Sequence, residues 1–440
     1  MNKALWIIIA IVVVAAVVIG VVVWTGDDEE GVGGGGEPVT DVTGAVAVMA
    51  VWTGAEQASF QAVLDGFNEA YPNVTVTYTS AGDQLPTVLG TAVEGGNPPD
   101  IAVLPQPGLM KEYADRGELQ SIDFARETID EHFAEDWVKL GTVDDTLYGL
   151  IFKGANKSTV WYNVNVFNDA GVAPPATWDE LLLAAEQIGA SGVPAYSIAG
   201  ADGWTLTDLF ENIYLRTAGP ELYDQLTAHE IPWTDPSVTV ALERMADLFA
   251  DAANIAGGTG GALQTDFPTS VTQVFKESPD AAMVFEGDFV QGVILDASEA
   301  MPGEDFDVFT FPSIEGSAPS VMGGGDLAVM FRDSDASRAL IEYLATPEAG
   351  EIWAARGGFS SPNRNVDPAV YPDDLTRQTA TDLAEAETFR FDLSDLTPSE
   401  FGGTPGQGMW QILQDFLQSP DQIEQTQQRL ESAAVQAYGR

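Results

Sequence analysis

Apolar runs alternate with amphipathic segments in the first part of this chain. Residues 45–52 (AVAVMAVW) and 98–105 (PPDIAVLP) contain apolar runs without polar alternation. Such runs are typical of strands in a parallel sheet that is covered on both faces. Between them, apolar residues recur at helical spacing over 60–67, residues 73–78 are strand-like, and residues 83–94 are helix-like. This alternation predicts an α/β fold with a doubly wound sheet.

The carboxyl ends of the buried strands predict a ligand site, because ligands of doubly wound sheets bind beyond those ends. Trp52 ends the first run, with Glu56 and Gln57 close behind it, and the loop after Asp100 belongs to the second run. We predict that the Trp52 ring is a stacking platform and that Glu56 and Gln57 bind the polar edge of a ligand. The alternative is that Trp52 is a core residue.

Later segments also mix strands and helices. Residues 147–167 are strand-rich, and residues 321–331 (VMGGGDLAVMF) join a glycine-rich crossing to a buried strand. Residues 177–188 predict an amphipathic helix with a capping box, in which Thr177 is the N-cap and Glu180 follows three residues later.

An uncharged apolar run, LWIIIAIVVVAAVVIGVVVW, covers residues 5–24. It has about the length of a helix that crosses the hydrocarbon core of a membrane. Lys3 precedes the run and acidic residues 27–30 follow it, which predicts that the rest of the chain lies outside the cytoplasmic membrane. A cleaved signal peptide is the alternative, but its apolar region is normally shorter. We favour an uncleaved transmembrane anchor over residues 1–26, followed by a flexible, acidic and glycine-rich linker over 27–44.

The composition narrows the classes of partner and chemistry. The 440 residues suggest two lobes, and 67 acidic against 18 basic residues give a formal charge of −49. Nucleic acid and anionic membrane surfaces would repel such a chain. The absence of cysteine excludes disulfides, thiol catalysis, cysteine-ligated metals and a lipid anchor on cysteine.

Catalytic motifs are missing from the sequence. The two histidines, His132 and His229, are far apart, and no nucleophile elbow or P-loop occurs. We therefore predict no enzyme, no metal site and no cofactor. An Asp/Glu pair for glycoside cleavage stays open as an alternative, because 67 acids supply many accidental pairs.

Aromatic residues beside polar groups in turn-rich segments are the most informative feature. A sugar ring has apolar C–H faces and a rim of hydroxyls, so it binds to a flat aromatic face edged by carboxylates and amides. Core packing is the alternative for each of them, and we expect Trp353 to be core. The aromatic residues concerned are Trp52, Trp204, Trp233, Phe289, Trp353 and Trp410.

An ordered series of segments resembles the extracellular solute-binding proteins of carbohydrate ABC importers, the class that includes maltose-binding protein. The segments include VWTGAEQASFQAVLDGFNEAYPNVTVTY, NPPDIAVLP, AAMVFEGDF, VMGGGDLAV and YLATPEAGEIWAARGGFSSPN. Two further segments, GADGWTLTDLFENIYLRTAGPELYDQL and FRFDLSDLTPSEFGG, resemble the branch for alpha-glucoside uptake.

The resemblance implies a two-lobed periplasmic-binding-protein fold with a hinge. Lobe 1 would comprise residues 45–152 and a returning segment, 326–366. Lobe 2 would comprise residues 153–325 and a returning segment, 380–440. The ligand residues that the resemblance and the pattern imply are Trp52, Glu56, Gln57, Asp100, Lys153, Asn156, Trp204, Asp208, Glu286, Asp288, Phe289, Gly324, Asp326, Gln407 and Trp410.

The resemblance further implies that a monomer captures a small oligosaccharide and delivers it to ABC permease subunits in the membrane. Phe289 and Leu104 stand where maltose binders often carry tryptophan, which favours a smaller glucoside such as trehalose, sucrose, maltose or a glucosyl-polyol. Two alternatives are a surface-anchored glycosidase that uses an Asp/Glu pair and a sensor whose anchor passes a signal inward. Only four residues precede the apolar run, which argues against the sensor.

Overall fold

Two β-sheets organise the part of the chain that the structure describes, residues 41–439 of a computed structural model. The first sheet has the strand order β12-β11-β3-β1-β2, with β6 also paired to β11, and the second has the order β10-β7-β9-β8. In the first sheet β1 is parallel to β2 and β3, whereas β11 is antiparallel to β3 and β6. The first-sheet strands are β1 (Gly44–Ala50), β2 (Val74–Ser80), β3 (Ile101–Leu104), β6 (Gly149–Asn156), β11 (Val321–Met330) and β12 (Phe389–Phe391). The second-sheet strands are β7 (Thr159–Asn163), β8 (Tyr196–Ser197), β9 (Met283–Phe285) and β10 (Phe306–Thr310); β4 (Thr142–Val143) and β5 (Thr146–Leu147) form a separate small ribbon.

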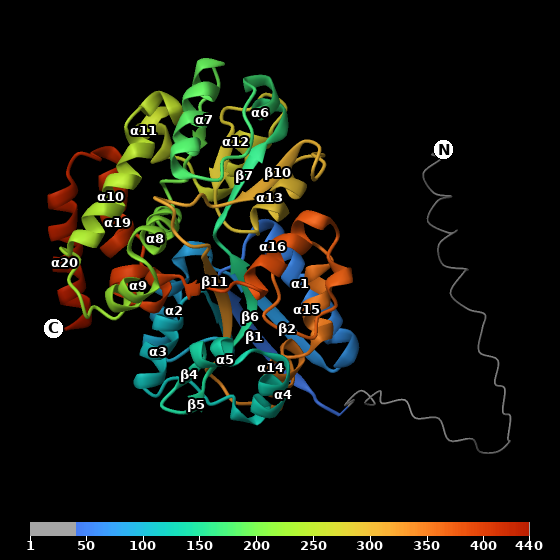
Figure 1. The fold of residues 1–440 in the computed structure, drawn as a ribbon. Helices are drawn as coiled ribbons and strands as arrows, with labels where there is room; N and C mark the ends of the chain where they lie inside the picture. The colour runs from blue at the N-terminus through green and yellow to red at the C-terminus, as the bar shows by residue number, and fades with distance from the viewer. Residues whose placement is uncertain (1–40, 440) are drawn as a thin grey trace, which may run out of the picture. The chain divides into compact units, whose positions relative to one another are not determined.

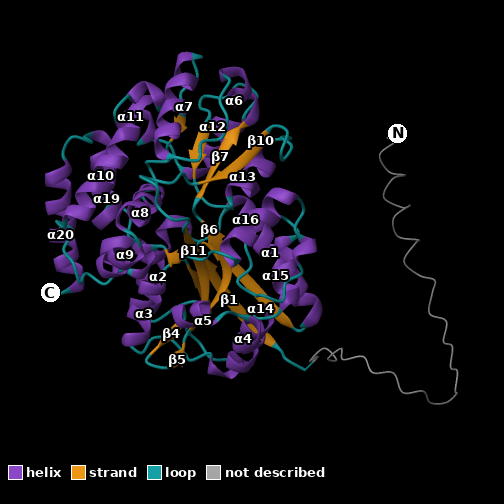
Figure 2. Ribbon diagram, in the orientation of Figure 1, coloured by secondary structure: helices purple, strands orange, loops and turns teal. Residues whose placement is uncertain are grey.

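Helices cover both sheets and form two lobes (Figures 1 and 2). The helices packed into the apolar cores of the first sheet are α1 (Gly54–Ala70), α2 (Leu85–Glu94), α3 (Pro107–Asp115), α4 (Arg126–His132), α5 (Glu135–Leu140), α14 (Asp335–Leu344) and α15 (Pro347–Ala354). Those packed into the cores of the second sheet are α6 (Val164–Ala170), α7 (Trp178–Ala190), α8 (Trp204–Ala218), α9 (Pro220–Thr227), α10 (Pro236–Phe249), α11 (Gly258–Ala262), α12 (Phe267–Phe275), α13 (Val290–Ala297), α17 (Leu393–Leu396), α18 (Ser399–Gly402), α19 (Gly408–Gln418) and α20 (Ile423–Tyr438). Helix α16 (Asp374–Ala384) packs against β6 and β11. The prediction of a two-lobed α/β fold is confirmed.

Local signals in the sequence account for several of these elements. The apolar runs form the buried strands β1 and β3, and the helical spacing over 60–67 lies inside α1. The capping box is confirmed: the Thr177 Oγ1 accepts a hydrogen bond from the Glu180 backbone N at 3.3 Å, and the Glu180 Oε2 accepts one from the Thr177 N at 3.1 Å. These bonds satisfy backbone donors that the first turn of a helix otherwise leaves free.

The glycine-rich crossing is a strand that lies directly on β6. In β11, Gly324 faces Ala155 in register, and Asp326 faces Lys153. A Cβ atom on Gly323 would lie 2.9 Å from the carbonyl O of Ala155, so a side chain there would push β11 away from β6, and Gly324 lies against the Lys157 side chain. The three glycines therefore allow close packing where the two lobes join.

The membrane anchor predicted over residues 1–26 and nearly all of the linker predicted over 27–44 lie outside the described residues. Within residues 41–439, none of the helices combines the length and the apolar character needed to span a membrane.

Trp52 is a core residue, so the prediction that its ring is a stacking platform is wrong. The side chain is 1% exposed, and its ring lies 4.6 Å from that of Phe60 and 4.7 Å from that of Trp353, centroid to centroid. Its Nε1 donates a hydrogen bond of 2.8 Å to Asp326 Oδ2. This bond connects the core residue Trp52 to β11 at the junction of the lobes. Trp353 is 1% exposed, as predicted for a core residue.

We expect Trp52→Ala to lower the free energy of unfolding by about 3–5 kcal/mol without any ligand, because it leaves a cavity in the first lobe. Trp52→Phe keeps most of the apolar contact and loses the bond to Asp326, so its cost should be clearly smaller. Chemical denaturation of both variants tests this. A Trp52→Ala protein within about 1 kcal/mol of the unmodified protein would contradict the assignment to the core.

Candidate functional site

A cavity of about 340 Å³ lies where the two lobes meet. Its wall combines residues of the first lobe, such as Thr53 and Gln106, with residues of the second, such as Trp204 and Trp410. Strands β6 and β11, which connect the lobes, contribute Lys153 and Asp326 to the same wall. The charged residues of the wall are the acids Glu56, Asp83, Asp202, Asp266, Asp326, Asp392 and Asp395 and the bases Lys153 and Lys157.

Aromatic side chains of the second lobe form one side of the cavity. The ring centroid of Trp204 lies 5.3 Å from that of Phe267 and 6.1 Å from that of Phe289. Trp410 also lines the cavity and packs against Gly203, whose added Cβ would lie 2.7 Å from the Cβ of Trp410. Gly203 has φ = 75°, which favours glycine, and α8 starts at the next residue. The glycine thus allows Trp204 and Trp410 to lie together.

Lys153 on β6 connects the two crossing strands to α1. Its Nζ lies 2.6 Å from Glu56 Oε1 and 3.8 Å from Asp326 Oδ2. The same ammonium lies 5.0 Å from the ring centroid of Phe289, within the range of a cation–π contact. Burial lowers the pKa of Lys153, but Glu56 and Asp326 outweigh burial and raise that pKa above its ordinary value. Lys153 is therefore a cation held between the lobes.

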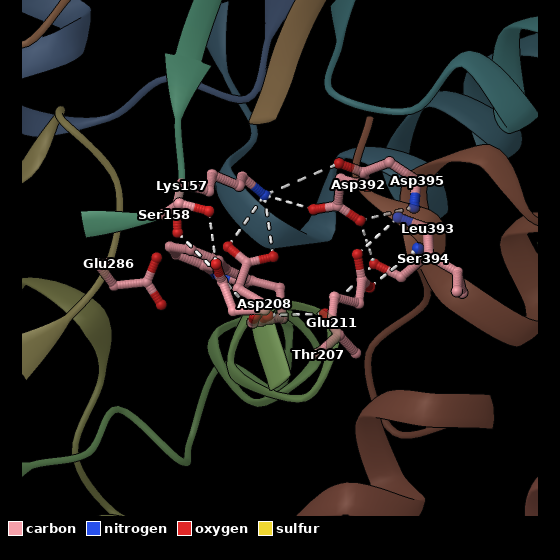
Figure 3. Close-up of polar contacts among 12 residues, drawn as sticks. Lys157, Ser158, Thr207, Asp208, Glu211, Glu286, Asp392, Leu393, Ser394 and Asp395 are labelled. Carbon is pink, nitrogen blue, oxygen red and sulfur yellow. Dashed lines mark hydrogen bonds and ion pairs between the residues drawn. The ribbon is translucent and has the colours of Figure 1, made fainter. Parts of the chain in front are cut away.

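The second lysine of the cavity lies in a buried group of acids that we term the Lys157 cluster (Figure 3). Lys157 Nζ lies 2.6 Å from Asp392 Oδ2, 3.0 Å from Asp208 Oδ2 and 4.0 Å from Asp395 Oδ2. Glu211 accepts hydrogen bonds from the backbone N of Leu393 at 2.5 Å and of Ser394 at 3.0 Å. The members of the cluster are Lys157, Asp208, Glu211, Glu286, Asp392 and Asp395.

One ammonium cannot neutralise five buried carboxylates, so the ionised form of most of these acids is disfavoured. Burial, with the neighbouring carboxylates, raises the pKa of Asp208, Glu211, Glu286 and Asp395 well above the ordinary range. Asp392 differs: burial would raise its pKa, but Lys157 and several hydrogen bonds lower it below the ordinary value. The cluster therefore combines a carboxylate whose ionised form Lys157 favours, Asp392, with acids whose ionised form is disfavoured. Asp395 lines the cavity, where a neutral acid can donate a hydrogen bond to a ligand.

A second group of acids faces across the cavity from the two lobes. Asp83, in the turn before α2, approaches Trp204, Asp202 and Asp266 of the second lobe. Burial and the charge of Asp202 raise the pKa of Asp83 to about 7, although a hydrogen bond with Trp204 acts in the opposite direction. Within residues 41–439 no group of three or more His, Cys, Asp or Glu side chains is arranged to hold a metal ion.

Of the ligand residues implied by the sequence, about half line the cavity. A further group lies behind its wall: Asp208 and Glu286 in the Lys157 cluster, and Gly324 against Lys157. Although the Trp52 ring belongs to the core, this residue still contributes to the wall. The implied residues that line the cavity are Trp52, Glu56, Lys153, Trp204, Phe289, Asp326 and Trp410.

Five of the implied residues lie elsewhere. Asp100 precedes β3, so it lies at the opposite end of that strand, where its Oδ2 accepts a hydrogen bond of 2.7 Å from the Ala47 backbone N. Asn156 and Asp288 bind each other at the crossing, through the Asn156 backbone N and Asp288 Oδ2 at 3.0 Å. Gln57 is exposed on α1, and Gln407 lines a separate groove between α19 and α20.

The sequence reasoning missed several residues of the wall. Gln106 follows the carboxyl end of β3, where the switch-point rule places ligands, so the rule was right and was applied to the wrong residue. Asp392 and Asp395 stand in FDLSDL, and Asp392 caps α17 by accepting a hydrogen bond of 3.1 Å from the Asp395 N. An aspartate three residues before another, after a short strand, signals that cap, but it does not reveal Lys157 as the partner.

We expect Lys157→Met to cost about 3–5 kcal/mol of stability at pH 8, because it leaves Asp392 buried without its cation. The loss should be smaller at pH 5, since Asp392 without Lys157 has to take up a proton to remain buried. Lys111→Met is the matched control: Lys111 forms an exposed pair with Asp115, which is worth about 1 kcal/mol at most. Equal, small losses for both variants would contradict the assigned role of Lys157.

Asp83 should make the stability of the protein depend on pH. Its pKa is about 7 in the folded chain against an ordinary value of 3.8. Its contribution to the free energy of unfolding is therefore complete below about pH 4 and is lost as the pH rises through 7, by at most about 1.4 kcal/mol per pH unit for one proton. Asp83→Asn should have a flatter stability profile between pH 4 and 7 than the unmodified protein. Parallel profiles would contradict this.

The sequence of the chain matches the family of bacterial extracellular solute-binding proteins over residues 52–351. The chain is 34% identical over 384 residues to the osmoprotective compounds-binding protein GgtB of Synechocystis sp., which covers 86% of this chain and 89% of that protein. It is also 34% identical over 388 residues to the alpha-glucosides-binding periplasmic protein AglE of Rhizobium meliloti, with 84% and 83% covered.

Solved structures share the fold at lower sequence identity. The bacterial solute receptor AcbH, described as having an exclusive preference for β-D-galactopyranose, has a TM-score of 0.79 at 20% identity, with 90% of this chain and 99% of that chain covered. A chitin oligosaccharide binding protein has a TM-score of 0.75 at 21% identity, with 90% and 100% covered. The resemblance that the sequence segments indicate is thus confirmed. The chain belongs to the family of bacterial extracellular solute-binding proteins.

Proposed function

We propose that this protein captures a small α-glucoside outside the cytoplasm, such as trehalose, sucrose, maltose or a glucosyl-polyol, and delivers it to an ABC permease. Membership of the solute-binding family supports the role of an extracellular receptor. The α-glucosides in the name of AglE and the osmoprotective compounds in the name of GgtB support the class of ligand. These relatives are named as binding proteins, which favours binding over the glycosidase alternative.

The observation that carries this proposal is that aromatic rings and acids line the same cavity. Trp204, Phe289 and Trp410 offer flat apolar surface to the C–H face of a sugar. Glu56 and Asp326 offer acceptors to sugar hydroxyls, while burial raises the pKa of Asp395 and so favours the form of that acid that can donate a hydrogen bond. The cavity volume of about 340 Å³ lies at the lower end of the range for small-molecule sites, which favours a small ligand.

Closure of the two lobes on the sugar is the mechanism that we propose. We place the boundaries at residues 152/153 and 325/326, where Lys153 and Asp326 face each other in register on β6 and β11. A ligand that contacts both walls binds the closed state better than the open one and shifts the population toward it. No covalent step is needed.

We also propose that residues 1–26 anchor the receptor to the cytoplasmic membrane. The uncharged run over residues 5–24 supports this, since it has about the length of a membrane-spanning helix. An anchor would keep the receptor at a high effective concentration near its permease.

Isothermal titration with trehalose, sucrose, maltose and glucosylglycerol tests the ligand class. We expect at least one of them to bind, and a good ligand at 100 times its Kd should raise the free energy of unfolding by about 2.7 kcal/mol. Failure of all four sugars to bind would contradict the proposed ligand class. Release of reducing sugar during the titration would instead favour the glycosidase.

We expect Trp204→Ala to weaken binding of that sugar by about 10- to 100-fold, the scale of a lost aromatic contact of about 1–3 kcal/mol. Phe124→Ala is the matched control, because Phe124 is also a half-buried aromatic residue and does not line the cavity. It should leave the affinity unchanged. An unaltered affinity of the Trp204→Ala protein would show that this ring does not contact the ligand.

A further inference from the structure

A contact between the lobes lies beside the cavity and does not form part of its wall. It joins α3 of the first lobe to the segment 397–403, which contains α18. Leu109 and Met110 of α3 belong to a core of the first sheet, whereas Leu393, before the segment, and Phe401, within it, belong to the main core of the second lobe. The contact therefore connects two separately packed bodies.

The centre of the contact is Glu112 on α3. Its Oε1 accepts a hydrogen bond of 2.8 Å from the Ser399 backbone N, and its Oε2 accepts one of 3.1 Å from the Ser399 Oγ. Hydrogen bonds to an ionised carboxylate are stronger than those between neutral groups. Both oxygens of one half-buried side chain thus bind a single residue of the other lobe.

Two glycines allow the backbones to approach at this contact. A Cβ atom on Gly108 would lie 2.2 Å from the carbonyl O of Thr397, and one on Gly403 would lie 1.9 Å from the Gln106 Nε2. Gln106 donates a hydrogen bond of 3.0 Å from that Nε2 to the Gly403 O. Gly108 therefore leaves room for the backbone of the other lobe, and Gly403 leaves room for the Gln106 side chain that binds its carbonyl O.

The contact adjoins residues on both sides of the cavity. Gln106, the N-cap of α3 and six residues before Glu112, lines the cavity from the first lobe, and Ser394 and Asp395 line it from the segment that leads to Ser399. Bonds from one lobe to the other exist only while the lobes are together, so they stabilise the closed state. Separation of the lobes would leave the Ser399 N and the Glu112 carboxylate to water.

We propose that Glu112 is a positioning residue for ligand binding, which latches the closed state through Ser399 without touching the ligand. This inference rests on the proposed closure of the lobes on a ligand. If the closed state is needed to hold the ligand, loss of the latch reduces the closed population and lowers the affinity in proportion. The effect should fall on the rate of dissociation, since the ligand leaves when the lobes open.

Three variants separate the latch from a general effect on stability. Glu112→Ala removes the carboxylate. Gly108→Ala adds a methyl group that blocks the closed state, although alanine favours an α-helix more than glycine does, so the open protein should be no less stable. Glu94→Ala is the matched control, because Glu94 is another acidic residue on a first-lobe helix, the last residue of α2, and belongs neither to the latch nor to the cavity wall.

The experiment measures the distance between the lobes by double electron–electron resonance. The chain contains no cysteine, so nitroxide spin labels can be attached at Thr91→Cys on the first lobe and Asp421→Cys on the second. Without sugar, we expect the unmodified protein to show a closed population that Glu112→Ala and Gly108→Ala reduce and Glu94→Ala does not. With the best of the four sugars, Kd should rise about tenfold for the first two variants, mainly through faster dissociation.

Distance distributions that are the same for all four proteins would overturn the latch. A Kd that is unchanged in Glu112→Ala, with a sugar that binds the unmodified protein, would overturn it as well. If none of the sugars binds the unmodified protein, the proposed ligand class fails, while the sugar-free distances still decide for or against the latch.

Discussion

The junction of the two lobes depends on the ion pairs that two lysines, Lys153 and Lys157, form with acids of this strongly acidic chain. Lys153 and Lys157 lie four residues apart on or just after β6, at the crossing between the lobes; Lys153 is buried, and the Lys157 side chain is 12% exposed. Each bonds to acids that come from distant parts of the sequence: Lys153 to Glu56 of α1, and Lys157 to Asp208 of α8 and to Asp392. Buried charges need such partners, because removing an ion from water is expensive. The two ion pairs therefore fix where α1, α8 and the segment after β12 meet.

The same electrostatics give the cavity its chemical character. Because one ammonium faces five carboxyl groups in the Lys157 cluster, the pKa values of four of these acids are raised, whereas that of Asp392 is lowered. Acids of both kinds can supply donors and acceptors, and the rings of Trp204 and Trp410 supply apolar surface in the same cavity. A neutral ligand with many hydroxyl groups suits this environment, whereas an anion would meet seven acids in the wall.

The sequence was informative where the signal is local. Apolar runs and the capping box at Thr177 each act within a few residues, and the strands and the helix start predicted from them are confirmed. The glycines of the crossing lie in a buried strand, but Gly324, which was predicted as a ligand residue, lies against Lys157 behind the cavity wall. Residues joined over long separations could not be predicted. Trp52 turns into the core because Trp353 packs against it and Asp326 accepts a hydrogen bond from its Nε1, both of them about three hundred residues away. Asp392 lies 235 residues from Lys157, and among 67 acids no local feature distinguishes the one that pairs.

Errors at the site have a similar physical origin. The rule for doubly wound sheets gave the correct edge of the sheet, but the start of β3 at Ile101 places Asp100 at the other end of the strand and brings Gln106 to the cavity. Residues implied by resemblance, such as Asn156 and Asp288, hold the crossing together beside the cavity. The place of a residue in the sequence pattern therefore predicted which loops meet at the cavity. Which side chains in those loops line the cavity depends on contacts that the pattern does not reveal.

The most direct test of the account is a crystal structure of the protein with a bound α-glucoside. The account predicts a sugar in the cavity between the lobes, with one ring face on Trp204 or Trp410 and with hydroxyl groups bonded to acids such as Asp326 and Asp395. A sugar bound at another surface, with this cavity filled by the protein's own side chains, would contradict it.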